Sequence, residues 1–214
     1  MATNMATKIV KLLIILLFSL HTVGCYAKPK VACVAPDKLP QHISSLGIKP
    51  TSHMILVDAK KQKMSVIHNG KIEKEYTIST SHRGLGQYVN TFQTPVGLHR
   101  INEKIGKGVP RYGIFNRRQF IGSAWKPRPR DKHRKDYIST RILRLEGLQP
   151  GLNKGQDFWG RTVDTETRAV YIHGTTMEWK LGRPSTKGCV HMSADDVIHL
   201  FEEVPEGTLV WIQG

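Results

Sequence analysis

From about residue 52 onwards, hydrophobic and polar residues alternate in short runs, a pattern typical of strands with one buried face. Two such runs, 63–70 and 71–80, meet at Asn69-Gly70. Both residues of this pair tolerate the positive φ that a two-residue hairpin turn requires, so a β-hairpin is predicted. Further strands are predicted at 54–58, 94–101, 140–148, 169–175 and 208–213.

One helix is predicted near the C-terminus, where Ser193 and Asp196 resemble a capping box and an amphipathic run follows. The fold class is therefore mainly β with one or two helices. Segment 111–136 differs, because it is strongly basic and its Pro127 and Pro129 interrupt regular structure. A long loop that binds a ligand or covers a site is predicted there, with a disordered segment as the alternative.

The N-terminus has the order of a secretory signal, since Lys8 and Lys11 precede the apolar run 12–20. This run is too short to span a bilayer as a stable helix, and a buried helix is the alternative. Cleavage is expected after Ala27, although residues 22–25 also resemble a lipobox that would place a lipid on Cys25, and an uncleaved anchor is the third alternative. The expected parts are a signal peptide over 1–27 (or a lipoprotein signal over 1–24), a proline-containing tether over 28–51 and a compact domain over 52–214.

The net charge of +15 belongs mostly to the processed protein, because residues 1–27 contain only two basic residues and no acidic ones. A basic protein exported to the periplasm or cell envelope would meet wall polymers, lipid headgroups or acidic substrates. A basic surface that only aids solubility is the alternative. No nucleic-acid recognition motif accompanies the charge, so no nucleic-acid partner is expected.

The stretch STKGCVHM, residues 185–192, raises the question of what Cys189 does. Packing, a disulfide with Cys33, and zinc binding with His173 and His191 are three candidate roles. A fourth role, nucleophile, accounts for more of the local sequence. Lys187 and the start of the helix would lower the pKa of the thiol.

A nucleophilic cysteine also needs a base, and His173 lies where a predicted strand ends. Gly188 leaves the backbone free to approach an oxyanion, so amides around 188–189 are candidates for an oxyanion hole. This chemistry needs neither a metal nor another cofactor, and none is expected.

Residues 172–212, from IHGTTMEWKLGRPSTKGCVHM onwards, resemble the signature of the L,D-transpeptidases, whose catalytic domain is YkuD-like. The upstream segments TPVGLHRINEKIG and TRILRLEGL also resemble this family, so the resemblance covers about residues 52–214. It implies a β-sandwich-like catalytic domain with a helix beside the cysteine.

The resemblance also implies an activity on peptidoglycan stem peptides outside the cytoplasmic membrane. Cys189 would attack the carbonyl on the L-centre of the third stem residue and form a thioester as D-alanine leaves. An amine of another stem, or of a cell-wall protein, would then take the acyl group, whereas water would make the enzyme an L,D-carboxypeptidase. His173 would act as base and later as acid, and Gly174 would shape the adjacent turn.

The motif departs from the family at three positions. Lys187 stands where the family usually has His, His191 stands where it has Arg, and Thr186 is an allowed replacement for Ser. Arginine binds carboxylates as a permanent bidentate donor, whereas histidine is weaker and pH-dependent. We expect all three residues to contact substrate, and Lys187 and His191 together to change substrate anchoring without abolishing it; a catalytically inactive protein that binds the wall is the alternative.

Overall fold

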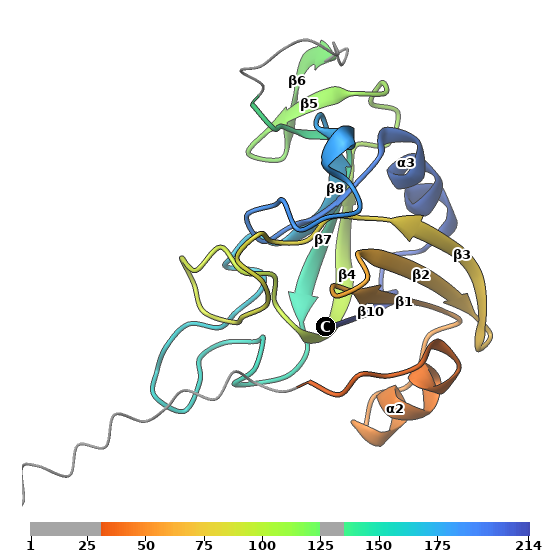
Figure 1. The fold of residues 1–214 in the computed structure, drawn as a ribbon, viewed down its shortest axis with the longest axis vertical. Helices are drawn as coiled ribbons and strands as arrows, with labels where there is room; N and C mark the ends of the chain where they lie inside the picture. Colours follow the sequence, from red (N-terminus) through yellow and green to blue (C-terminus); the bar gives the residue numbers. More distant parts are fainter. Residues whose placement is uncertain (1–30, 125–134) are drawn as a thin grey trace, which may run out of the picture. The chain divides into compact units, whose positions relative to one another are not determined.

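The computed structural model describes residues 31–124 and 135–214, and within these ranges the chain is mainly β, as predicted (Figure 1). Among the described residues, no helix is long and apolar enough to cross a membrane. The helices are α2 (Leu39–Ser45) and α3 (Ala194–Glu203), and 3-10 turns cover Pro36–Lys38 and Glu178–Lys180. The strands are β1 (His53–Asp58), β2 (Lys63–His68), β3 (Lys71–Thr77), β4 (Gly97–Ile105), β5 (Gly113–Asn116), β6 (Gln119–Ala124), β7 (Ile138–Gly147), β8 (Tyr171–Thr175), β9 (Val190–Met192) and β10 (Leu209–Gln213).

The strands form one mixed sheet in the order β3-β2-β1-β10-β4-β7-β5-β6, and β8 and β9 extend from β7. The pairs β1–β10 and β8–β9 are parallel, and the other pairs are antiparallel. The strand β7 pairs with β4, β5 and β8, so it joins the strands that carry the active-site candidates to the rest of the sheet.

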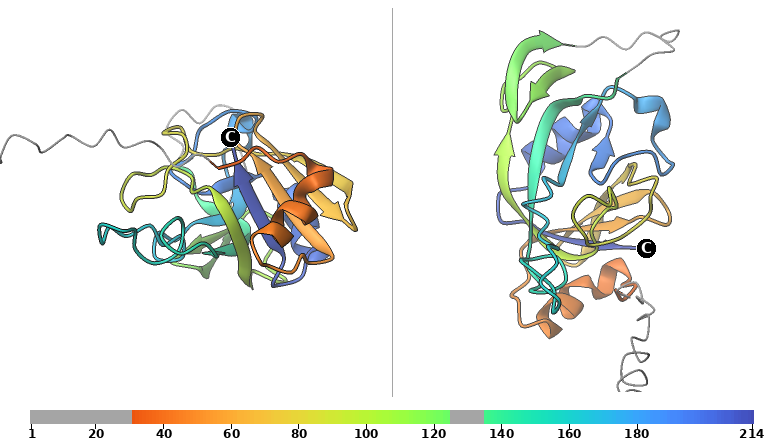
Figure 2. Two further views of the ribbon diagram at one scale, coloured as in Figure 1. Left: turned by 90° about the horizontal axis from the view of Figure 1, so that it is seen from below. Right: turned by 90° about the vertical axis from the view of Figure 1, so that its left-hand side faces the viewer.

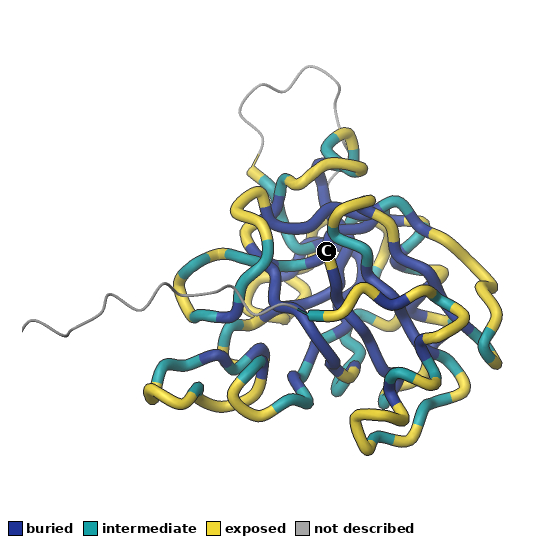
Figure 3. The backbone as a smooth tube through the Cα atoms, turned by 60° about the horizontal axis from the view of Figure 1, so that its bottom comes forward, coloured by how far each residue is buried: buried dark blue, intermediate teal, exposed yellow. Residues whose placement is uncertain are grey.

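Strand β1 shows how the sheet is covered on both faces. Ile55 and Val57 contribute to the core that also contains α3, while Met54 and Leu56 contribute to the core that contains α2. Because successive residues of a strand point to opposite faces, α2 and α3 cover opposite faces of the sheet, as Figures 1 and 2 also show. The buried stretches in Figure 3 accordingly follow the central strands.

The core under α3 joins the two ends of the sheet. Val66 and Tyr76 from β2 and β3 belong to the same buried cluster as Ile172 and Met192 from β8 and β9. Leu200 of α3 completes this contact and is fully buried. The sheet therefore closes around this cluster in the sandwich-like manner that was expected.

The segment 28–51 was expected to be a tether with at most one short helix, and its described part, from residue 31 onwards, packs on the sheet. Leu39 and Ile43 of α2 are completely buried in a cluster with Trp211. The N–H of Val34 donates to the side-chain oxygen of Gln213 at 2.7 Å. Two apolar residues four positions apart were the sequence signal for this helix, and they are too few to indicate a period.

We predict that Ile43→Ala lowers the free energy of unfolding by about 2–4 kcal/mol, because it leaves a cavity in a well-packed core. Leu46→Ala, next to the same helix but at a side chain that is 38% exposed, serves as the matched control and should change stability little. Urea unfolding of both variants measures the difference. An effect of Ile43→Ala as small as that expected of the control would mean that α2 does not contribute to the stability of the folded domain.

The loop predicted over 111–136 contains a hairpin in its described part. Strands β5 and β6 pair around Arg117 and Arg118, which both have positive φ, and arginine gives no sequence signal for such a turn. Pro127 and Pro129 lie outside the described residues. Two local predictions are confirmed: Asn69-Gly70 turns with φ of 49° and 78°, and the Ser193 hydroxyl accepts a hydrogen bond from the Asp196 N–H at 3.1 Å.

Candidate active site

Cys189 and His173 line one cavity of about 410 Å³. Strand β8 carries His173, and β9 begins directly after Cys189 and runs parallel to β8 with His173 opposite His191. Ile172 and Val190 are paired in the same two strands and are fully buried in the core. Because side chains alternate along a strand, this burial directs His173 and His191 to the opposite face, where the cavity lies.

His173 is held in one tautomer by its own strand. Its Nδ1 lies 2.9 Å from the carbonyl oxygen of Gly174, and since a carbonyl only accepts, Nδ1 carries the proton. Nε2 is then the nitrogen that can accept a proton. Burial lowers the pKa of His173 below its ordinary value, so the imidazole is neutral at pH 7. This is the protonation state that a general base requires.

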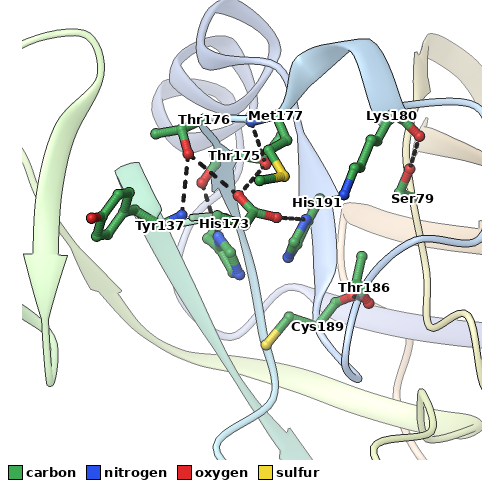
Figure 4. A network of polar contacts seen from close by, with 12 residues as sticks. Ser79, Tyr137, His173, Thr175, Thr176, Met177, Lys180, Thr186, Cys189 and His191 are labelled. Carbon is green, nitrogen blue, oxygen red and sulfur yellow. Dashed lines mark hydrogen bonds and ion pairs between the residues drawn. The ribbon is translucent and has the colours of Figure 1, made fainter. Parts of the chain in front are cut away.

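Cys189 is half-buried, and Figure 4 shows its side chain reaching into the space below His173. Its Sγ lies 3.7 Å from the carbonyl oxygen of Ala169. Burial raises the pKa of the thiol to about 11, an effect opposed by the N–H of Tyr171 and the charge of Arg168. The resting thiol is therefore protonated and needs a base. Cys33, the other cysteine of the described residues, is also a free thiol, so the disulfide alternative does not hold in this structure.

Asp136 is a cavity residue that the sequence analysis did not single out. One of its carboxylate oxygens accepts a hydrogen bond from the Thr175 hydroxyl at 2.6 Å, and the other lies 3.3 Å from Nδ1 of His191. Asp136 is distant from both residues in the sequence, and no motif links them. Its place in the cavity depends on the pairing of β7 with β8, which the sequence does not reveal.

His191 was expected to meet a substrate carboxylate, but its Nδ1 faces the carboxylate of Asp136. Burial, followed by the nearby His173 and Lys180, holds the pKa of His191 well below its ordinary value. The lowered pKa leaves His191 neutral, with its Nδ1 3.3 Å from a carboxylate oxygen of Asp136. The centroids of the His191 and His173 rings are 4.5 Å apart, so the two imidazoles lie next to each other.

Thr186 and Gly188 shape the loop that presents Cys189. The Thr186 hydroxyl is buried, accepts a hydrogen bond from the Gly188 N–H at 3.2 Å and donates one to the Cys189 carbonyl at 2.7 Å. The Gly188 amide, a candidate for the oxyanion hole, is therefore engaged within the loop. Gly188 has a φ of +124°, which residues with a side chain rarely adopt, and its carbonyl accepts a hydrogen bond from the Thr94 hydroxyl. The backbone conformation at this position therefore requires glycine.

Gly174 lies at a tight contact between two strands, whereas Lys187 lies exposed at the cavity. A Cβ on Gly174 would come within 2.7 Å of the Ser139 carbonyl, so glycine permits the close pairing of β8 with β7. Lys187 is exposed and lines the cavity together with Lys135 and Lys180. The cavity therefore has several cationic groups around it, while its inner wall carries the two histidines and Asp136.

The sequence of the chain matches the model of one known protein family. A family model described as the L,D-transpeptidase catalytic domain, YkuD, matches residues 52–212, which is most of the chain. The chain belongs to this family. The resemblance inferred from the cysteine motif and its upstream segments is thereby confirmed.

The chain matches individual L,D-transpeptidases only over part of their length or at low sequence identity. The chain is 44% identical over 69 residues to Bacillus subtilis YqjB, a candidate L,D-transpeptidase by name, in a match covering 32% of this chain and 39% of YqjB. A Mycobacterium smegmatis L,D-transpeptidase is similar with 14% identity and a TM-score of 0.44 over 78% of this chain and 61% of that chain. An Enterococcus faecium L,D-transpeptidase mutant is similar with 17% identity and a TM-score of 0.45, over 76% of this chain and 50% of that chain. The chain thus spans less than two thirds of the length of these relatives.

In this L,D-transpeptidase domain, Thr186→Val should lower the free energy of unfolding by about 1–3 kcal/mol, because it leaves the Gly188 N–H and the Cys189 carbonyl without their shared partner. Thr186→Ser keeps the hydroxyl and should preserve most of that stability. Urea unfolding compares the two variants. If Val and Ser behaved alike, the hydroxyl would not be what orders the loop.

Proposed function

We propose that this L,D-transpeptidase-family protein is an exported cysteine acyltransferase that acts on peptidoglycan tetrapeptide stems. The observation that carries the proposal is that Cys189 and a neutral, oriented His173 share one cavity. A protonated thiol beside a neutral imidazole is the pair that general-base activation of a nucleophile requires.

In the first half-reaction, Nε2 of His173 accepts the thiol proton as Sγ of Cys189 attacks the carbonyl on the L-centre of the third stem residue. The resulting tetrahedral intermediate collapses as His173 returns the proton to the nitrogen of the departing D-alanine. The C–N bond breaks and a C–S thioester remains. Because burial keeps the thiol protonated at rest, proton transfer accompanies the attack.

In the second half-reaction, the amine of an acceptor stem, or of a cell-wall protein, attacks the thioester carbonyl. His173 takes a proton from the attacking nitrogen, and Cys189 leaves as a thiol when that proton returns to sulfur. A new amide bond forms and the C–S bond breaks. Water in place of the amine would give the L,D-carboxypeptidase reaction with the same groups.

Stem peptides carry carboxylates, and the cationic groups around the cavity suit them. Lys135, Lys180 and Lys187 all line the cavity, whereas His191 is committed to Asp136. We therefore assign substrate anchoring to these lysines rather than to His191. Lys135 and Lys187 are exposed and Lys180 is partly exposed, so anchoring by these charges should weaken as salt increases and screens them.

The test is mass spectrometry of products after the purified protein is incubated with a disaccharide-tetrapeptide. Loss of D-alanine together with a cross-linked dimer supports transpeptidation, and loss of D-alanine with only monomeric tripeptide indicates the carboxypeptidase. No product from folded, reduced protein would contradict both activities. It would favour a wall-binding protein without catalysis.

Export is part of the same proposal and rests on the charged and apolar order of residues 8–20, which lie outside the described residues. The intact mass of the protein recovered from the cell envelope tests it. An N-terminus after Ala27 indicates ordinary cleavage, and a lipid-bearing Cys25 indicates an anchor. An uncleaved chain recovered from the cytoplasm would contradict export.

A further inference from the structure

Two histidines stack on the first hairpin of the domain, away from the residues that line the active-site cavity. His53 begins β1 and His68 ends β2, and the two are directly opposite each other in the antiparallel pair. Their side chains therefore share one face of the sheet. The ring centroids are 4.2 Å apart and the ring planes differ by 17°.

A carboxylate joins this pair from the third strand through an irregularity in the sheet. The register between β2 and β3 passes from Ile67 opposite Ile72 to Val66 opposite Lys74, which leaves Glu73 as the extra residue of a bulge. Bulges redirect side chains locally. Here a carboxylate oxygen of Glu73 lies 3.5 Å from Nδ1 of His68.

The three side chains have the chemistry and spacing of a metal site. One ligand atom each from His53, His68 and Glu73 lie within 4.8 Å of one another. Two ligands bound to tetrahedral zinc at about 2.1 Å are roughly 3.4 Å apart, close to the His68–Glu73 separation. The two rings are stacked with their planes 17° apart, so binding would also require the imidazoles to rotate until their in-plane lone pairs converge on the ion.

The surroundings also favour binding. Ser52 Oγ lies 3.3 Å from Nδ1 of His53, which engages one ring nitrogen and leaves the other for a metal. All three ligands are at least partly exposed, so an ion can reach them. They come from three neighbouring strands, which hold their backbones in place before a metal arrives.

We propose that His53, His68 and Glu73 form a binding site for Zn²⁺, with a water molecule as the fourth ligand. Two imidazoles and a carboxylate are ligands that zinc accepts, and three protein ligands with one open position are a common zinc arrangement. The bound ion would link β1, β2 and β3. It would therefore stabilise this edge of the sheet by binding the folded state only.

Isothermal titration of the full-length protein with Zn²⁺ tests the site. His53→Gln, His68→Gln and Glu73→Gln should each weaken one zinc equivalent at least about tenfold, because each removes a ligand. His199→Ala is the matched control, since His199 also contacts a carboxylate, Glu203 at 3.2 Å, but in the described residues this pair has no third ligand nearby. It should leave the affinity and stoichiometry unchanged, and the thiols are the same in every variant.

Thermal melting provides a second readout. Zn²⁺ should raise the melting temperature of the wild-type and His199→Ala proteins and should raise that of the three ligand variants less. Glu73 is exposed, so Glu73→Gln tests the site even if a histidine variant unfolds. Zinc binding that is the same in wild type and Glu73→Gln, by both methods, would overturn the proposal.

Discussion

Replacing Cys189 with alanine is expected to abolish D-alanine release, with kcat falling by at least about 10³-fold, because no other group in the cavity can form the thioester. The fold should persist, since Cys189 is only half-buried at the edge of a small apolar cluster. Release of D-alanine from the tetrapeptide measures the effect.

The control for this variant is Cys33→Ala. Cys33 is the other free thiol of the described residues, and it is exposed and lines no part of the active-site cavity. Its replacement should leave the rate unchanged. Substantial activity in Cys189→Ala, or equal losses in both variants, would exclude Cys189 as the nucleophile.

Replacing His173 with glutamine should lower kcat by about 10²–10⁴-fold, because the thiol then has no base to accept its proton. Burial makes this dependence stronger, since it raises the pKa of the Cys189 thiol to about 11 and leaves almost no thiolate at neutral pH. His199→Ala, at an exposed histidine outside the cavity, should retain full activity.

The pH profile of the wild-type enzyme provides a separate check on His173. The base must be neutral, so the rate falls as pH decreases through its pKa. Because burial lowers the pKa of His173, the fall in the free enzyme's kcat/KM should lie below pH 6.5. A fall centred above pH 6.5, or a His173→Gln variant as active as wild type, would contradict the assigned role.

Local signals in the sequence predicted the elements that depend on adjacent residues. Asn69-Gly70 specified a hairpin and Ser193 specified a helix start, because turn geometry and capping involve only a few neighbouring groups. Cys189 and His173 could be selected for the same reason: a motif and a strand end identify them before the fold is known. The structure brings these two residues to one cavity.

Features that depend on contacts between distant segments could not be predicted. The packing of α2 depends on Trp211, and the pairing of Asp136 with His191 depends on the register of β7 and β8. The position of the Thr186 hydroxyl could not be predicted either. A threonine in a motif does not show whether its hydroxyl faces a ligand or, as here, the adjacent backbone.

The two residues that differ most from the family motif, Lys187 and His191, change the distribution of charge at the cavity. An arginine at position 191 would be a permanent cation beside His173, whereas His191 is neutral and lies with its Nδ1 3.3 Å from a carboxylate oxygen of Asp136. The protein therefore combines a less charged inner wall with lysines at the cavity. Under the proposed function, orientation of the base and attraction of the substrate would fall to different residues.

The stem peptide should become covalently attached to Cys189 during turnover, and the intact mass of the protein tests this most directly. After rapid mixing with the disaccharide-tetrapeptide and acid quenching, the wild-type protein should gain the mass of the donor minus D-alanine. Peptide mapping should place that mass on Cys189, and Cys189→Ala should gain none. An adduct on another residue, or D-alanine release with no adduct at any reaction time, would contradict the account.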